Sequence, residues 1–318
     1  MKILNFILMV IVTFIVFSCN EDINPNADFR ERYIMNCVLK SDSTIQTVTI
    51  LKTYKVDDFD PYTNTENPFI QGADVKVWFN NKIYQFKDSS SAGNSSDRFE
   101  GDIYFYYNKD IVLESGKYLE IESLLPNGLR LSSILKTPSS EIDFDGSEVL
   151  IPPESGNKTL IFKWNDDEEN ILYAPRFVIR YYNYINGTGV LKYKDVPIKY
   201  VDNNENEAVY PEPSKNKGYS ISVSDFEKAL VSIAPTEGQR KNYTILGFSI
   251  LLQLYDENLS IYYSSIQNSS DPYTVNLNEN NFTNIEGGYG IFGAYMTKEH
   301  KILFDRDYIL SLGFKPGF

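Results

Sequence analysis

The amino-acid sequence predicts a mainly β protein: an N-terminal Ig-like β-sandwich at residues 29–138, then a second β-rich domain with two short helices at residues 139–318. Short runs rich in β-branched and aromatic residues recur along the chain, and Gly, Pro and Asn separate them, which is typical of antiparallel sheets. No long helical period occurs in the first of these domains. The 24 Tyr and 20 Phe supply apolar bulk for sizeable cores.

The first 18 residues have the features of a bacterial signal peptide. Lys2 precedes an almost wholly apolar run, residues 3–17, which is shorter than the roughly 20 residues of a membrane span. The run ends at Ser18-Cys19, a small residue before cysteine that resembles the lipobox of bacterial lipoproteins. We therefore expect a signal peptide at residues 1–18 and a lipid on Cys19. A signal peptide cut elsewhere, or an uncleaved anchor, is the alternative.

A polar segment, residues 19–28, follows the expected lipid anchor and predicts a short tether. Asn20, Glu21 and Asp22 resemble the export signal that places Bacteroidota lipoproteins on the outer face of the outer membrane. The resemblance implies a lipid-anchored outer-membrane protein that faces the cell surface. The alternative is that these residues are polar only because a tether must be solvated.

Strands of the first domain are predicted from alternating hydrophobicity and from the turns between the strands. Asn80-Asn81 and Pro126-Asn127-Gly128 each separate two strand-like runs, and both sequences favour tight hairpin turns. Short strands joined in this way indicate a sandwich. The runs expected to form strands are residues 33–39, 47–51, 75–79, 83–86, 116–121 and 129–131.

The second domain is predicted to begin at residue 139, within the boundary segment 137–140, and to combine strands with helices. Ser224 and Glu227 have the spacing of a capping box, which predicts a helix over residues 225–232. Residues 257–267 are expected to form the other helix. The expected strands are residues 159–164, 175–182 and 243–255.

Charge and cysteine content exclude several classes of protein. The chain has 30 Lys and Arg against 43 Asp and Glu, a net charge of −13, so it repels phosphate backbones and nucleic-acid binding is not expected. With Cys19 lipidated, Cys37 is the only thiol left, which excludes an intramolecular disulfide. Cys37 lies in a strand-like run, where a small buried apolar side chain is the usual role.

Sequence motifs of catalysis are missing. The single histidine, His300, lies in a charged segment that predicts an exposed turn, and one histidine excludes His-rich zinc sites. No Walker, H-E-x-x-H or G-x-S-x-G sequence occurs. A hydrolase based on two carboxylates needs no such signature and stays an alternative. We expect a protein that is not an enzyme and that uses no cofactor.

Two polar segments are candidates for other kinds of site. Asp57, Asp58 and Asp60 alternate with other oxygen donors, but the run lacks the glycine and the closing glutamate of an EF-hand loop. A solvated loop is therefore the alternative to a calcium site. Residues 42–44 resemble the short O-glycosylation acceptor of Bacteroidota proteins, with Ser43 as the acceptor, and a plain turn is the alternative.

A glycine-rich segment near the C-terminus, residues 284–295, is the most distinctive part of the chain after the leader. Its glycines permit positive φ or close backbone approach, and its apolar residues supply bulk, so we expect a kinked strand packed against the core. A ligand or partner surface is the alternative. The residues of this C-terminal motif are Asn284, Ile285, Gly287, Gly288, Gly290, Phe292, Gly293 and Tyr295.

The C-terminal motif resembles the signature N-I-x-x-G-x-G-I/Y-F-G-A/G-Y that ends the Bacteroidota lipoproteins classed as domain of unknown function 4249. The lipobox, the early strand at residues 33–39, and residues 72–77, 116–118 and 164–166 fit the same family pattern. The resemblance spans nearly the whole chain after the leader. Family members look like genomic neighbours of TonB-dependent transporters, which implies an accessory role in nutrient capture.

Taken with the resemblance, the sequence predicts a surface-anchored outer-membrane lipoprotein that assists a TonB-dependent nutrient transporter without catalysing a reaction. The nutrient is not identified by any motif. The alternative is a structural or adhesive envelope lipoprotein that binds no small molecule. Loop or edge aromatics are the candidates for ligand contacts: Tyr62, Phe69, Tyr104, Tyr106 and Tyr107.

Overall fold

The computed structural model describes residues 29–55, 64–93, 101–139, 141–169, 171–185, 187–201, 207–269 and 282–318. Of these, Arg32–Phe318 forms one compact unit. The predicted signal peptide at 1–18 and tether at 19–28 lie outside the described residues, with Cys19, Asn20, Glu21 and Asp22. The calcium candidates Asp57, Asp58 and Asp60 and the aromatic Tyr62 also lie outside them.

A large mixed sheet runs through the described part of the chain. Two short strands, β18 (Lys315–Pro316) and β9 (Leu150–Ile151), pair with β16 and β17 beside the main path of this sheet. The strands of that path are, in spatial order, β12 (Thr188–Asp195), β11 (Tyr173–Ile185), β16 (Tyr243–Tyr255), β17 (Tyr289–Phe304), β1 (Tyr33–Lys40), β2 (Gln46–Lys52), β6 (Ile103–Asn108) and β5 (Lys87–Ser91).

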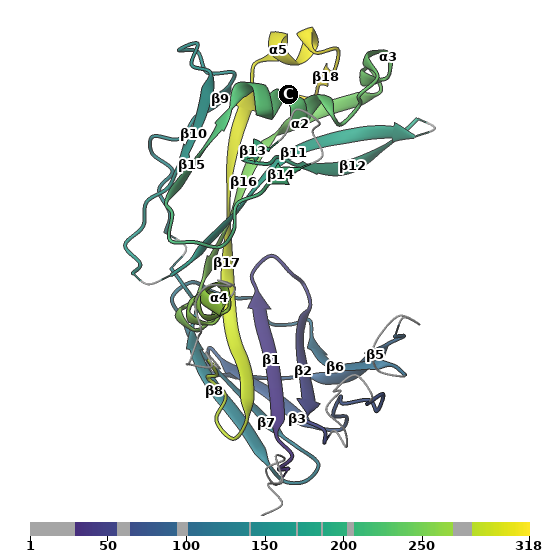
Figure 1. Ribbon diagram of the computed structural model, residues 1–318, viewed down its shortest axis with the longest axis vertical. Coiled ribbons are helices and arrows are strands. Elements are labelled where there is room, and N and C mark those ends of the chain that lie inside the picture. The colour runs from purple at the N-terminus through teal and green to yellow at the C-terminus, as the bar shows by residue number, and fades with distance from the viewer. Residues whose placement is uncertain are drawn as a thin grey trace, which may run out of the picture. The chain divides into compact units, whose positions relative to one another are not determined.

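Strand β17 pairs with both halves of the sequence. Its residues Tyr289–Tyr295 run parallel to β1, and Tyr295–Ile302 run antiparallel to β16 (Figure 1). The C-terminal segment therefore belongs to the same sheet as β1 and β2 near the start of the chain. The domain boundary at residues 138 and 139 stays a prediction, and the structure adds that residues 285–296 pack in the core of the first half.

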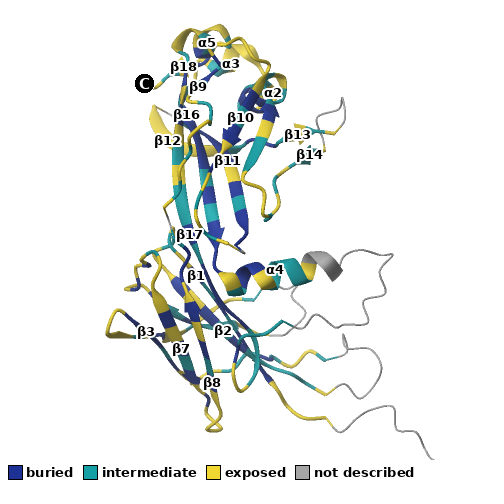
Figure 2. Ribbon diagram, turned by 90° about the vertical axis from the view of Figure 1, so that its left-hand side faces the viewer, coloured by how far each residue is buried: buried dark blue, intermediate teal, exposed yellow. Residues whose placement is uncertain are grey.

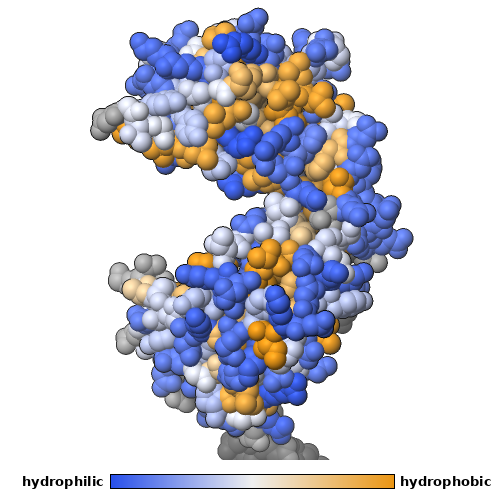
Figure 3. All heavy atoms as spheres, turned by 180° about the vertical axis from the view of Figure 1, so that it is seen from behind, coloured by the Kyte–Doolittle hydropathy of each residue, from blue (hydrophilic) through white to orange (hydrophobic). Residues whose placement is uncertain are grey.

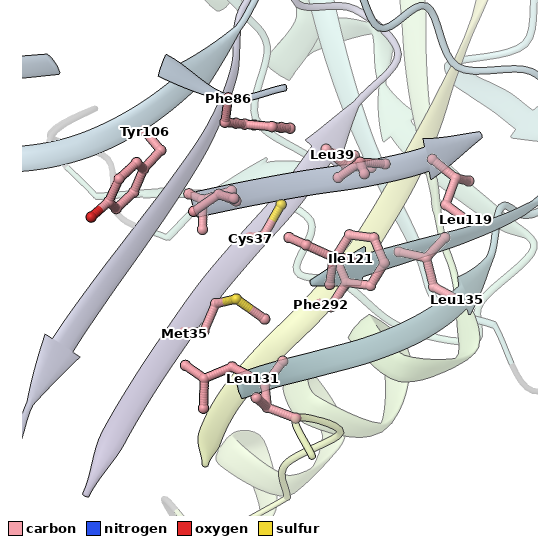
Figure 4. Close-up of a cluster of buried hydrophobic side chains, with 14 of the residues drawn as sticks. Met35, Cys37, Leu39, Phe86, Tyr106, Leu119, Ile121, Leu131, Leu135 and Phe292 are labelled. Atoms are coloured by element: carbon pink, nitrogen blue, oxygen red, sulfur yellow. The ribbon is translucent and has the colours of Figure 1, made fainter. Parts of the chain in front are cut away.

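The first core lies between the large sheet and a small antiparallel sheet. The buried side of β1 supplies Met35, Cys37 and Leu39, and Phe292 of β17 joins them (Figure 4). Burial raises the pKa of the Cys37 thiol, and this cysteine is the small buried apolar residue that the sequence predicted. The small sheet has the order β4 (Lys82–Gln85), β3 (Asp74–Phe79), β7 (Tyr118–Leu124) and β8 (Arg130–Lys136).

The hairpin turns of the small sheet have the backbone geometry that their sequences predict. Asn80 and Asn81 connect β3 to β4 with φ of 48° and 60°, the pair of positive values that a type I′ turn requires. Gly128 connects β7 to β8 with a φ of 85°. These turns fix the register, so each strand presents its apolar side chains to the core.

The second core lies between the other end of the large sheet and a two-stranded antiparallel sheet together with the helix α2. Strands β10 (Thr159–Lys163) and β15 (Gly218–Ser222) pair antiparallel, and α2 (Val223–Val231) follows directly. Phe226 of α2 packs edge-on against Phe248 of β16, with ring centroids 5.1 Å apart. Two short strands, β13 (Lys199–Tyr200) and β14 (Ala208–Val209), pair antiparallel and precede β15 in the chain.

Helices are few, and the mainly β prediction is confirmed. Besides α2, the described residues form α3 (Glu237–Arg240), α4 (Glu257–Ser269) and α5 (Arg306–Ser311). The helices expected at residues 225–232 and 257–267 correspond to α2 and α4.

The predicted cap of α2 is wrong by two residues. Ser222, not Ser224, is the N-cap, because its extended backbone ends β15 and its hydroxyl accepts a hydrogen bond from the Asp225 N–H at 3.0 Å. Ser224 already lies inside the first turn. The sequence pattern located the helix but could not show that β15 leads into it without a loop.

The predicted exposed turn around His300 is also wrong. His300 lies inside β17, is half-buried, and stacks on Phe144 with ring centroids 4.5 Å apart. Burial lowers the pKa of the imidazole, although a hydrogen bond with the backbone of Glu148 opposes this shift. Lys298, Glu299 and Lys301 suggested a turn. In β17, however, the more exposed charged side chains alternate with more buried ones, as a strand permits.

Candidate functional site

The C-terminal motif begins with Asn284, whose side-chain amide pairs with the backbone of Phe292 as the backbone of a neighbouring strand would. The Asn284 amide donates to the Phe292 carbonyl at 2.7 Å and accepts from the Phe292 N–H at 2.9 Å. This bidentate pairing satisfies both backbone groups of a residue whose ring is fully buried in the first core. Ile285 is buried in the same core.

The glycines of the motif lie where other backbone segments come very close. A Cβ at Gly288 would lie 2.7 Å from the Tyr33 carbonyl oxygen. A Cβ at Gly287 or Gly290 would collide with the carbonyl oxygen of Arg130 or Met35, and both glycines also have positive φ. Only glycine permits this approach, so these positions join β17 to β1 and β8.

The last glycine of the motif, Gly293, makes room for α4. A Cβ there would lie 3.1 Å from the Leu259 Cβ and 3.3 Å from the Asp256 Oδ1. Asp256 caps α4 by accepting from the Leu259 N–H at 3.0 Å, and it is almost completely buried. Burial raises the pKa of this carboxyl to about 7, and its Oδ2 has no hydrogen-bond partner.

Tyr295 connects the motif to the turn that contains the predicted glycosylation site. Its hydroxyl donates to Asp42 at 3.0 Å, and the Thr297 hydroxyl donates to the same carboxylate at 3.0 Å. Ser43 is half-buried in this turn, where its hydroxyl donates to the Ile45 carbonyl at 2.8 Å. Glycosylation of Ser43 stays a prediction.

Of the predicted ligand-contact aromatics that the structure describes, Tyr104 and Tyr106 line one hollow, whereas Phe69 and Tyr107 are not part of its lining. Tyr106 is a core residue, so its prediction is wrong: its hydroxyl donates to the Ile70 carbonyl at 2.8 Å and accepts from the Ala73 N–H at 3.0 Å. Tyr104 and Tyr106 both line a hollow of about 510 Å³. Phe69 and Tyr107 are half-buried, and Lys109 lies 5.6 Å above the Tyr107 ring.

The acidic segment that follows Trp164 is held by its own neighbours. Asp166 accepts from the Tyr173 hydroxyl at 2.5 Å and forms an ion pair with Lys217 at 3.3 Å. Both partners of this carboxylate are therefore residues of the protein itself. Asp166 also lines a hollow of about 480 Å³. No cluster of three or more His, Cys, Asp or Glu side chains suited to a metal ion occurs among the described residues.

A different hollow, which the sequence did not reveal, has an aromatic lining. We call it the aromatic groove. It has a volume of about 810 Å³ and opens broadly to solvent. The loop between β14 and β15 supplies most of its wall, and α4, Tyr219 of β15 and Ile198 before β13 supply the rest. The lining residues are Ile198, Tyr210, Pro211, Glu212, Pro213, Ser214, Asn216, Tyr219, Tyr263 and Ile266.

The floor of the aromatic groove is supported from behind by buried rings. Tyr219 stacks on the fully buried Trp164, with ring centroids 6.1 Å apart, and its hydroxyl lies 3.1 Å from the Ser214 Oγ. Ser214 is itself held by two backbone hydrogen bonds to Tyr173 of β11, at 2.8 and 3.0 Å. The groove wall is therefore fixed before any ligand arrives. On the α4 side, Tyr263 packs against Tyr255 at 5.2 Å.

One edge of the large sheet is an exposed hairpin, residues 181–195, which we call the outer hairpin. The register places Tyr182 opposite Leu191 and Arg180 opposite Tyr193, so these side chains share a face with Tyr184. Figure 2 shows buried residues along β11 and β16 and mainly exposed residues on β12. The most exposed large apolar side chains here are Tyr184, Ile185, Val190, Leu191 and Tyr193.

The family model described as Domain of unknown function (DUF4249) matches residues 20–301. The chain belongs to this family. The match extends from the residue after Cys19 through the whole C-terminal motif, so the DUF4249 region includes both segments that β17 and β1 bring together. A search of curated proteins finds no match to this DUF4249 chain. Within the described residues, no helix has the length and apolarity to cross a membrane.

Proposed function

We propose that this DUF4249 protein is a surface-anchored outer-membrane lipoprotein of Bacteroidota, lipidated on Cys19. In this proposal it is a non-enzymatic accessory of a TonB-dependent nutrient transporter. The lipobox-like Ser18-Cys19 and the acidic residues after it support the anchor and the outward orientation. Several acyl chains on one cysteine suffice for stable attachment, whereas the acidic chain would adhere poorly to anionic lipid.

The outer hairpin is the observation that carries the transporter part of the proposal. Tyr184 of β11 and Leu191 and Tyr193 of the edge strand β12 are 44%, 42% and 53% exposed on one face of the outer hairpin. Figure 3, a view from behind, shows hydrophobic patches interrupting a mostly hydrophilic surface. Exposed apolar side chains that share one face are typical of protein interaction sites, and the edge strand β12 offers unpaired backbone groups to a partner.

A binding role also fits the chemistry of the described side chains better than catalysis does. His300 is packed against Phe144 and its pKa is lowered by burial, so it is poorly placed as a general base. Asp256, whose carboxyl has the pKa best suited to proton transfer, is buried under α4 and away from the lining of the aromatic groove. The aromatic groove instead offers ring faces, neutral polar groups and one carboxylate, Glu212.

A mild-detergent pull-down of the full-length protein through a C-terminal tag tests the proposal. We expect to recover an outer-membrane transporter barrel with the wild type. We expect at least tenfold less of it with Tyr184→Ser/Leu191→Ser, because the apolar face of the outer hairpin is lost. Cys19→Ala should move the protein from the membrane to the soluble fraction.

Ile83→Ser/Ile134→Ser is the matched control for this pull-down, since Ile83 and Ile134 are 61% and 60% exposed on the small sheet. Equal loss of the barrel in both double variants would contradict a specific role for the outer hairpin. Recovery of the tagged protein alone would favour the structural or adhesive alternative.

A further inference from the structure

We propose that the aromatic groove is a binding site for a neutral saccharide. A sugar ring has two flat apolar faces of C–H groups and a rim of hydroxyls that both donate and accept hydrogen bonds. A site for such a ligand needs exposed flat rings beside uncharged polar groups. The aromatic groove combines these two features, with Glu212 as the one charged group in its lining.

The flat surfaces come from tyrosine and proline. Tyr210 is 48% exposed, and Pro211 and Pro213 lie beside it in the wall. Tyr219 forms part of the floor of the groove, and Tyr263 of α4 lines its other side. Aromatic side chains provide large contact area at little conformational cost, and here the stack of Tyr219 on Trp164 further limits that cost.

The polar groups of the aromatic groove favour hydroxyl partners over anions. Ser214, Asn216 and the tyrosine hydroxyls can donate and accept, and Glu212 can accept from two hydroxyls. None of the described residues that line the groove carries a positive charge. With a chain net charge of −13, an anionic ligand would meet repulsion without a compensating cation.

A second hollow continues the aromatic groove past Tyr210. It has a volume of about 360 Å³ and shares Tyr210 and Pro211 as its border. Its polar part is the Arg176–Asp195 pair, in which Nε and Nη2 of Arg176 donate to the two carboxylate oxygens at 2.5 and 3.0 Å. A planar pair of this kind keeps further donors and acceptors for adjacent hydroxyls. An oligosaccharide that crosses Tyr210 fits both hollows better than a single sugar does.

This inference deepens the proposed function, because it names the class of nutrient that the transporter would receive. The two can fail separately. The saccharide site is tested with purified protein and no transporter present, whereas the pull-down requires no sugar.

The test is titration of the purified full-chain protein with defined oligosaccharides, measured by calorimetry and by tryptophan fluorescence. The detergent is an amine oxide, because glycoside detergents would compete. The probes are malto-, cello-, xylo- and mannohexaose, with oligogalacturonate as the anionic comparison and a tyrosine-proline peptide as the peptide comparison. In a Trp78→Phe background, Trp164 is the remaining tryptophan and reports on Tyr219.

We expect at least one neutral hexaose to bind and to change the Trp164 emission. Tyr210→Ala should weaken that binding about tenfold or more, because it removes an aromatic contact at the centre of the site. Asn216→Ala should weaken it severalfold. Tyr118→Ala, which removes an exposed tyrosine from the small sheet, should change it less than twofold. The proposal is overturned if no neutral hexaose binds, if only the anionic sugar or the peptide binds, or if Tyr210→Ala and Asn216→Ala leave binding unchanged.

Discussion

Alanine at position 290 is expected to destabilise the protein by about 3 kcal/mol or more. Gly290 has a φ of 110°, which a side chain adopts only with strain, and its Cβ position is already occupied by the Met35 carbonyl oxygen. β17 and β1 would have to separate at the centre of the first core. Denaturant unfolding followed by far-UV circular dichroism measures the loss.

Gly116→Ala is the control that separates backbone strain from steric collision. Gly116 has a φ of 67°, and a Cβ there would meet nothing within 4 Å. We expect this variant to lose only about 1 kcal/mol, the usual strain of a left-handed residue. Equal losses of stability in Gly116→Ala and Gly290→Ala would contradict this account, because the collision with the Met35 carbonyl oxygen would then add nothing to the strain of the positive φ.

The stability of the protein is expected to fall with rising pH because of Asp256. The folded protein holds the Asp256 proton up to about pH 7, whereas an unfolded aspartic acid loses it near 3.9. The stabilisation from this proton is complete below about pH 4 and is lost as pH rises to about 7. Asp256→Asn keeps the cap of α4 without the charge. The stability of Asp256→Asn relative to the wild type should therefore increase across this range, by roughly 4 kcal/mol at most.

Unfolding free energies of both proteins at pH 4, 5, 6, 7 and 8 measure this effect. The difference between Asp256→Asn and wild type should widen up to pH 7 and then stay level. Asp305→Asn is the matched control, because Asp305 caps α5 through the Tyr308 N–H but is only half-buried. A difference that does not change with pH for Asp256→Asn would refute the assignment of a buried, protonated carboxyl.

Local sequence patterns predicted the strands and turns well, because local chemistry determines them. Asn80-Asn81 forms the expected tight turn, and residues 243–255 form a strand with the expected bounds. These features depend on positive φ at neighbouring residues or on an unbroken apolar run. The motif glycines could likewise be assigned to close backbone approach, although not to particular partners.

Long-range pairing could not be read from the sequence. Nothing local to residues 289–295 indicates that they run parallel to residues 34–40, about 250 positions earlier in the chain. The aromatic groove escaped notice for the same reason: Tyr210 and Tyr219 meet Tyr263 of α4 only in the fold. The Tyr210-Pro211-Glu212-Pro213 run was a usable signal, since an exposed aromatic among prolines has a fixed backbone and little to pack against locally.

Photocrosslinking in living cells tests most directly whether the outer hairpin binds a transporter. A photoreactive phenylalanine at Leu191 would sit on the exposed face of β12, and the same residue at Ile83 would sit on the small sheet as the control. The account predicts that the Leu191 position yields an adduct with a TonB-dependent transporter and that the Ile83 position does not. Illumination that yields no transporter adduct at Leu191, or equal adducts at both positions, would contradict it.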